Sequence, residues 1–146
     1  MATRATYQFK TGYTTSTVYI HWDGYLAGAA HYFNEALKLR GGNANEVYKE
    51  QKRDMFACFV WANDQATMTD GHEAHGDTDY RYDVSRYGGE WKIVARKRVS
   101  YSNDEFEIVY DGDLADFIEQ YLTEGDEAWY TTLNTYYVNR QSLRTI

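Results

Sequence analysis

The segment Asp70–Asp79, which reads DGHEAHGDTD, holds the densest set of side chains that could bind a metal ion. The candidate ligands in it are His72, His75 and Asp77. Imidazole nitrogens and carboxylate oxygens together suit zinc, manganese or iron. His-x-x-His on a loop is a weaker indication than His-Glu-x-x-His on a helix, however. The sequence favours a solvated acidic loop, so the expected cofactor is none, with a divalent metal as the alternative.

A second group of chemically able side chains lies in Tyr19–Phe33, which reads YIHWDGYLAGAAHYF. Free N–H groups at a helix N-terminus can bind phosphate or carboxylate, and His21 and Tyr25 would stand beside such a ligand. Asp23 competes with this anion site, because its carboxylate can accept from the same N–H groups as a structural cap. The cap is the favoured interpretation. The candidate ligand-binding residues are Tyr19, His21, Tyr25 and His31.

The turn around Asp23 has an echo later in the chain. Trp22–Ala27 (WDGYLA) aligns with Tyr110–Ala115 (YDGDLA), and each block follows alternating segments and opens a helical pattern. Six positions are too few to indicate a duplication, so one turn used twice is the safer interpretation. Asp111 is therefore expected to cap its helix as Asp23 does, with the adjacent glycine taking the unusual backbone angle. His21 has no counterpart in the second block, so the turn does not require it.

A basic stretch, VARKRVSY, is a third candidate. Arg96 and Arg98 alternate onto one strand face, where tyrosines of neighbouring strands could join them in a surface that stacks bases. Those tyrosines are Tyr80, Tyr82 and Tyr101. Cross-strand pairing with Glu105 and Glu107 is the alternative. Because the formal net charge is −7, nucleic-acid binding is not expected.

Signatures of known enzymes are absent from the sequence. It contains no G-x-x-x-x-G-K-[ST], no G-x-G-x-x-G and no nucleophile elbow. Its one cysteine, Cys58, lies in the apolar run MFACFVW, which indicates a buried thiol and excludes an internal disulfide. No apolar run is long enough to cross a membrane, and the N-terminal residues do not resemble a secretion signal. We expect a cytoplasmic protein that is not an enzyme.

Hydrophobic periodicity predicts the elements that must position these residues. Alternation predicts strands over 4–10, 17–23, 80–86, 90–101 and 105–110, with Trp22 on the core face of the second. Three- and four-residue spacing predicts helices over 26–40, 43–63 and 113–122, and it favours another over 126–140. Residues 64–79 are polar and without period, which indicates a long loop.

These elements predict one α+β domain over residues 1–146, with about five mostly antiparallel strands and three to four helices packed on one face. Fifteen tyrosines and no proline make the composition unusual. Tyrosines on the uncovered sheet face would form a Tyr-rich binding surface. A homodimer is expected, because a two-fold pair is the commonest oligomer of such a chain.

The segments ATYQF and VYIHWDGYLAGAAHYF together resemble a block found in small uncharacterised proteins of phages and mobile gene cassettes of the integron type. That block reads hydrophobic-His-x-Asp-Gly-Tyr, then a pair containing proline, then Gly-Ala-Ala, and Leu26 stands where the proline is common. The resemblance implies a mobile genetic element and no known activity. The expected function is a non-enzymatic accessory protein that engages a host protein or small ligand. The alternatives are a small metal-dependent enzyme and a nucleic-acid-binding module.

Overall fold

A computed structural model of the chain describes residues 3–40, 55–63, 65–87 and 90–122. The first part of the predicted helix 43–63 and the whole predicted helix 126–140 lie outside these residues. The strands are β1 (Ala5–Thr11), β2 (Thr14–Ile20), β3 (Thr67–Thr69), β4 (Tyr80–Tyr87), β5 (Glu90–Ser100) and β6 (Glu105–Asp113), and the helices are α1 (Leu26–Arg40), α3 (Met55–Ala62), α4 (Leu114–Tyr121) and the short 3-10 helix η2 (His72–Ala74).

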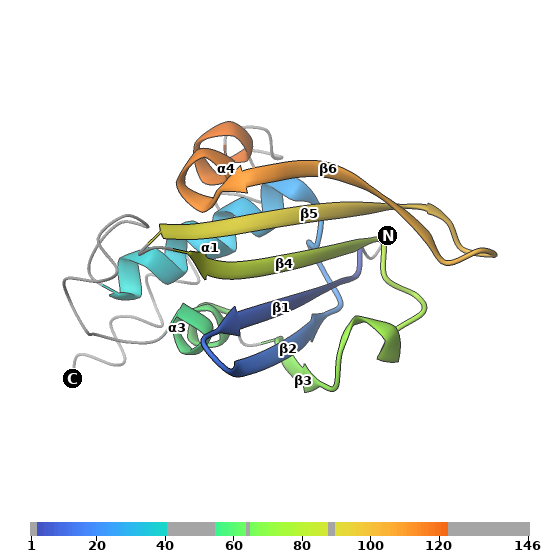
Figure 1. Ribbon diagram of the computed structural model, residues 1–146, viewed down its shortest axis with the longest axis horizontal. Helices are drawn as coiled ribbons and strands as arrows, with labels where there is room; N and C mark the ends of the chain where they lie inside the picture. Colours follow the sequence, from blue (N-terminus) through green and yellow to red (C-terminus); the bar gives the residue numbers. More distant parts are fainter. Residues whose placement is uncertain (1–2, 41–54, 64, 88–89, 123–146) are drawn as a thin grey trace.

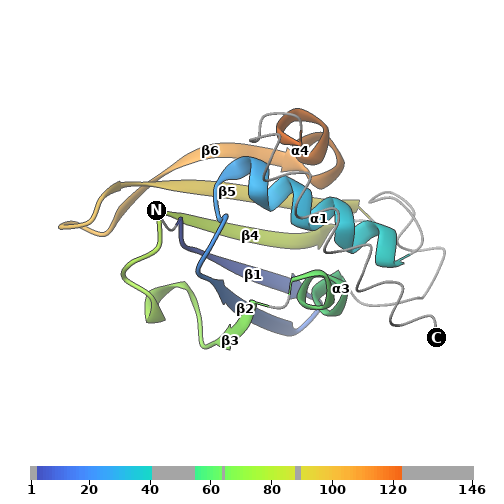
Figure 2. The ribbon, with the colours of Figure 1, turned by 180° about the vertical axis from the view of Figure 1, so that it is seen from behind.

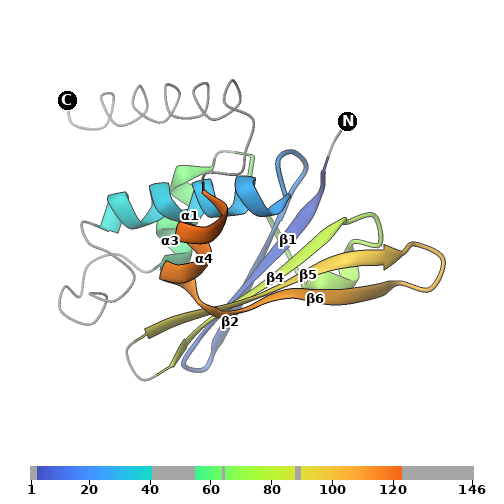
Figure 3. The same cartoon turned by 90° about the horizontal axis from the view of Figure 1, so that it is seen from above.

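The strands form one six-stranded sheet in the order β3-β2-β1-β4-β5-β6 (Figure 1). Neighbours are antiparallel except at the centre, where β1 and β4 run parallel. Helices α1, α3 and α4 all cover the same face of the sheet, as the views from behind and from above show (Figures 2 and 3). The opposite face, which these helices do not cover, is called the open face below. The predicted α+β fold with a mostly antiparallel sheet is thereby confirmed.

Alternation along the central strands determines what enters the core. On β1, Ala5, Tyr7 and Phe9 are buried toward the helices, so the intervening residues face the other way. Tyr7 lies in register with Tyr82 of β4, and their rings stack at 4.6 Å between centroids. Aromatic pairs of this kind stabilise beyond the apolar area they bury.

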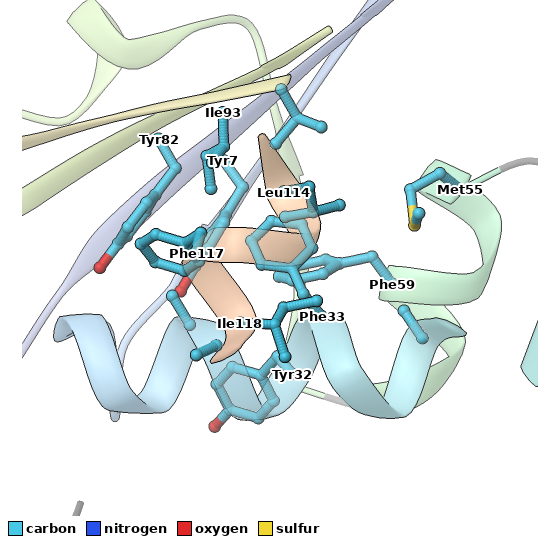
Figure 4. Packing of buried hydrophobic residues seen from close by; sticks show 14 of the residues in the cluster. Tyr7, Tyr32, Phe33, Met55, Phe59, Tyr82, Ile93, Leu114, Phe117 and Ile118 are labelled. Atoms are coloured by element: carbon cyan, nitrogen blue, oxygen red, sulfur yellow. The ribbon is translucent and has the colours of Figure 1, made fainter. Parts of the chain in front are cut away.

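Each helix adds an aromatic side chain to this layer (Figure 4). Phe33 of α1 and Phe59 of α3 both pack on Tyr7, with ring centroids 5.9 and 4.6 Å away. Phe117 of α4 packs edge-on against Tyr82 at 6.3 Å. The layer of tyrosine and phenylalanine rings therefore joins the sheet to its three helices.

Several expected boundaries differ from the structure: β2 already begins at Thr14, and β6 continues to Asp113. β2 ends at Ile20 rather than at Asp23, and Trp22 is 52% exposed instead of facing the core. The strand cannot continue because Asp23 adopts a left-handed backbone angle, φ +62°. The predicted loop 64–79 in fact contains the edge strand β3 and the helix η2, both too short to give a periodic signal.

The predicted caps Asp23 and Asp111 do not occupy cap positions. The Tyr25 carbonyl accepts from the Ala29 N–H at 2.9 Å, so α1 is entered two residues after Asp23. Asp111 is still within β6, and the cap position of α4 is Asp113, whose side chain makes no capping bond. In both blocks the leucine two residues beyond the glycine is the first helical residue, so the aligned blocks do share the start of their helices.

The glycines of the first turn are required for close packing. Gly24 donates its N–H to the Thr3 carbonyl, and a Cβ on it would lie 2.6 Å from the Ala5 Cβ. A Cβ on Gly28 would lie 2.0 Å from the Asp23 carbonyl oxygen. The turn therefore presses directly onto the N-terminal ends of β1 and α1.

In the part of the chain that the structure describes, no helix is both long enough and apolar enough to span a membrane.

We expect Gly28→Ala to lower the free energy of unfolding. Alanine alone would stabilise a helix by about 0.5–1 kcal/mol, but the clash with the Asp23 carbonyl costs about 1–3 kcal/mol or more. Urea unfolding of both proteins measures the difference. Gly76→Ala is the control, because a Cβ there meets nothing within 4 Å. Equal stability of Gly28→Ala and the parent chain would show that the turn does not pack as described.

Candidate functional site

Three of the four histidines gather on the open face of the sheet. Tyr19 of β2 and Thr6 of β1 are register partners on that face, and the histidines contact these two side chains. His21 and His75 contact Tyr19, whereas His72 contacts Thr6. Segments more than fifty residues apart in the chain are thereby brought together.

Tyr19, His21, Trp22 and His75 form a cluster that we call the Tyr19 platform, in which Trp22 is exposed and the other three are half-buried. The rings of Tyr19 and His75 stack in near-parallel planes with their centroids 4.3 Å apart. The Tyr19 hydroxyl and His21 Nδ1 are 3.1 Å apart, and the His21 ring meets Trp22 edge-on at 4.8 Å. Each ring of the platform therefore contacts the next one.

Polar contacts around the rim hold the platform in place. The Thr69 hydroxyl and His75 Nε2 share a hydrogen bond of 2.7 Å, which orients the imidazole over Tyr19. Arg4 Nε lies 3.3 Å from the Asp77 carboxylate beside it. Burial raises the pKa of Tyr19, and the negative charge of Asp77 raises it further, so this phenol keeps its proton at neutral pH.

Gln65 fixes the main chain under the platform. Its side chain accepts from the Trp22 N–H at 2.9 Å, and it donates to the Trp22 carbonyl and to the Tyr32 hydroxyl. The expected partner Tyr25 is not part of the platform, because its hydroxyl donates to Asp23 Oδ1 at 3.3 Å within the turn.

A chain of polar groups that is buried at Thr6 and His72 and partly exposed at Asp83 and Arg96, which we call the His72 pin, ties the segment before β4 to the sheet. His72 Nδ1 is 2.6 Å from the Thr6 hydroxyl, and Nε2 is 2.9 Å from Asp83 Oδ1. The other Asp83 oxygen accepts from Arg96. Burial alone would raise the pKa of Asp83, but hydrogen bonds and charges from His72 and Arg96 outweigh it and hold that pKa below the usual value.

The His72 pin has the composition of a catalytic relay but not its accessibility. Thr6 is completely buried, so no substrate reaches its hydroxyl as it would reach a nucleophile. Both ring nitrogens of His72 already have partners, which leaves neither for a reacting group. The geometry is that of a structural bridge between β1 and β4.

The expected metal ligands are committed to different neighbours. His72 belongs to the pin, His75 to Thr69 and Tyr19, and Asp77 to Arg4. Among residues 3–40, 55–63, 65–87 and 90–122, no three His, Cys, Asp or Glu side chains are arranged to hold a metal ion. The arrangement therefore gives a metal-dependent mechanism no support.

The two arginines expected to form a basic sheet face are paired with aspartates. Arg98 is ion-paired with Asp104 at 3.0 Å and stacks on Tyr101 and Phe106, so its partner is not Glu105 or Glu107. Arg96 pairs with Asp83 rather than with a glutamate. Of the tyrosines proposed to stack bases, Tyr82 is buried in the core. These neutralised arginines do not form an open surface for phosphates.

The expected Tyr-rich surface is only partly present. Buried tyrosines among the described residues are Tyr7, Tyr32, Tyr82 and Tyr121. The Tyr82 hydroxyl donates to the Gly24 carbonyl at 2.6 Å, which shows how a core tyrosine satisfies its polar tip. Strand alternation places Tyr7 and Tyr82 on the helix-covered face, and Tyr32 and Tyr121 lie on the helices themselves, so the number of tyrosines alone does not indicate a binding surface.

The fourth histidine, His31, is separated from the others by the sheet. It lies in α1, fully buried, with its Nε2 3.9 Å from the carboxylate of buried Glu35. Burial lowers the pKa of His31 to about 4, with a smaller contribution from Lys38, and burial raises the pKa of Glu35. The residue expected to bind a ligand is thus a neutral core histidine.

Comparisons with protein-family models, curated proteins and solved structures find no match to the chain.

Replacing Asp83 should test the pin. Asp83→Asn removes a charge-assisted hydrogen bond and the partner of Arg96, which is expected to cost about 1.5–3 kcal/mol of unfolding free energy at pH 7. Because the folded pKa of Asp83 is lowered, its contribution is present above about pH 4 and is lost as the pH falls through the folded pKa. Denaturation at several pH values, with exposed Asp111→Asn as the control, measures this. Equal losses of unfolding free energy in Asp83→Asn and Asp111→Asn would show that Asp83 does not stabilise the fold through His72 and Arg96.

His31 should also lower stability as the pH falls, but over a higher pH range than Asp83. Its imidazole is expected to stay neutral down to about pH 4, while the unfolded chain takes up a proton near pH 6.5. Stability should therefore fall as the pH drops from 6.5 to 4, by on the order of 3 kcal/mol from this group, partly offset by Glu35. Imidazole NMR shifts report the His31 titration directly. A midpoint near 6.5 would contradict its burial.

Proposed function

We propose that the chain is a non-enzymatic binding protein that engages a protein partner through the Tyr19 platform. The observation that carries this proposal is the contact of four rings, from β2, its following turn and the segment after η2, three of them half-buried and the fourth exposed. Trp22, at 52% exposure, offers the largest apolar side chain of the four to a partner. The fold does not need Trp22 in the core, and the turn does not need His21.

The chemistry of the platform suits a protein surface. Tryptophan, tyrosine and arginine supply most of the binding energy in protein interfaces, since they give large contact area and also hydrogen bonds. Side chains already held by neighbours lose little conformational entropy on binding. Thr69 and the Tyr19 ring hold His75 in this way, and Gln65 holds the backbone of Trp22.

The side chains that could act in catalysis are bonded to one another, which supports a non-enzymatic role. Thr6, His72 and Asp83 satisfy one another in a closed structural bridge. The resemblance of the first quarter of the chain to phage and gene-cassette proteins supports an accessory role in a mobile element, acting in the cytoplasm on a host protein. If the chain forms the expected homodimer, the alternative partner for the platform is a second copy of the chain.

Site-specific photocrosslinking tests the proposal. p-Benzoylphenylalanine replaces Trp22 and, separately, Tyr13, in cells that produce the chain. Tyr13 is the matched control, because it is aromatic and fully exposed on the β1–β2 turn. We expect a discrete protein adduct from position 22 that is absent from position 13.

His21→Ala in the same background should reduce the adduct by about tenfold, since it removes a ring that contacts both Tyr19 and position 22. An adduct of twice the mass of the chain would identify a second copy as the partner. Equal adducts from both positions, or none from position 22, would contradict the platform as the binding site.

A further inference from the structure

Among the described strands, β6 lies at one edge of the sheet, and the outer side of its backbone pairs with none of them. It has nine residues, whereas the strand at the other edge, β3, has three (Figure 1). No strand of the described residues pairs with the outer side of β6. Unpaired N–H and C=O groups along such an edge can pair with a further strand.

The same strand carries three carboxylates that form no ion pair within the described residues, although Lys97 of β5 is the register partner of Glu107. Glu105, Glu107 and Asp111 are exposed and form no ion pair with any described residue. Other carboxylates on or near the sheet are paired: Asp83 with Arg96, Asp104 with Arg98 and Asp113 with Lys92. The edge therefore differs electrostatically from the rest of the sheet.

We propose that the outer edge of β6 binds an extended, basic segment of another protein by strand addition. Main-chain hydrogen bonds would supply affinity, and cross-strand contacts with the side chains of β6 would supply specificity. Lysine or arginine at alternate positions of the added strand would face Glu105 and Glu107. A second copy of this chain does not fit, because pairing two β6 strands brings carboxylates opposite one another.

Register restricts the docking segment to the first part of β6. Ala95 pairs with Tyr110 but Arg96 pairs with Ile108, so Val109 is an extra residue that bulges the edge. The stretch Glu105–Ile108 precedes this bulge. The other register shift, between Arg98 and Ser100, leaves the extra residue Val99 on β5 and not on β6. Ile108 is 56% exposed and lies on the face opposite Glu107, where it offers an apolar contact to the residues between the basic ones.

This site is separate from the Tyr19 platform, and it does not rest on the proposed function. The platform lies at β2 and the segment after η2, and three strands (β1, β4 and β5) separate β2 from β6 in the sheet order. The two sites can be tested one at a time.

The test uses a fluorescent seven-residue peptide of alternating lysine and valine, blocked at both ends, with the full chain. We expect saturable binding that weakens with added salt and that protects β6 amides from hydrogen exchange. The double variant E105K/E107K should weaken binding by at least about tenfold, because it reverses the charges that face the lysines. Its matched control is D116K/E119K, which makes the same charge change at two exposed positions of α4.

A second peptide, N-methylated at alternate residues, keeps the charge and removes strand-edge hydrogen bonding. It should bind at least about tenfold more weakly than the parent peptide. The proposal is overturned if both peptides bind equally, if the α4 control loses as much affinity as the β6 variant, or if the amides of β6 gain no protection. It is also overturned if sedimentation at tens of micromolar shows a dimer that E105K/E107K dissociates, since the occupant is then a second copy.

Discussion

The parallel pairing of β1 with β4 is the contact on which the rest of the structure depends. It joins the unit β3-β2-β1 to the unit β4-β5-β6, and it is the one parallel pair in the described sheet. On the helix-covered side it places Tyr7 beside Tyr82, whose stacked rings receive the aromatic side chains of all three covering helices. Loss of this pairing would separate both the sheet and its core into halves.

On the open face the same pairing makes the His72 pin possible. Thr6 on β1 and Asp83 on β4 lie on either side of the central seam, and one imidazole joins them. His72 thereby fixes the segment between β3 and β4, and His75 follows three residues later, where it stacks on Tyr19. The central strand pair therefore positions the His72 pin, and the pin positions the segment that carries His75 to the Tyr19 platform.

Part of this organisation could be predicted from the sequence. Period-two alternation along β1 places Tyr7 and Phe9 in the core and Thr6 on the other face, and the structure agrees. The helical spacing after Asp23 likewise predicted α1. These predictions succeed because burying apolar side chains requires them to recur every second residue along a strand and every three or four residues along a helix, and this spacing is visible in the sequence.

The candidate site could be predicted only in pieces. Residue type alone indicates Tyr19 and His21, but the sequence near Thr69 and Gln65 does not show that they bond to His75 and Trp22, because these bonds join distant segments. The sequence indicates a cap at Asp23 that the structure does not have, because the left-handed angle of Asp23 and the close approach of Gly24 to Ala5 depend on tertiary packing. β3 and η2 escaped prediction because three residues carry no measurable period.

The central claim is that the segment after η2 docks on β2 and completes the platform. Proton NMR of the His75 ring tests it most directly, because an imidazole stacked 4.3 Å from the Tyr19 ring lies in that ring's shielding region. The account predicts nuclear Overhauser contacts between the two rings and upfield-shifted His75 ring protons that return to ordinary positions in Tyr19→Ala. Unshifted His75 protons with no contact to Tyr19 would contradict it.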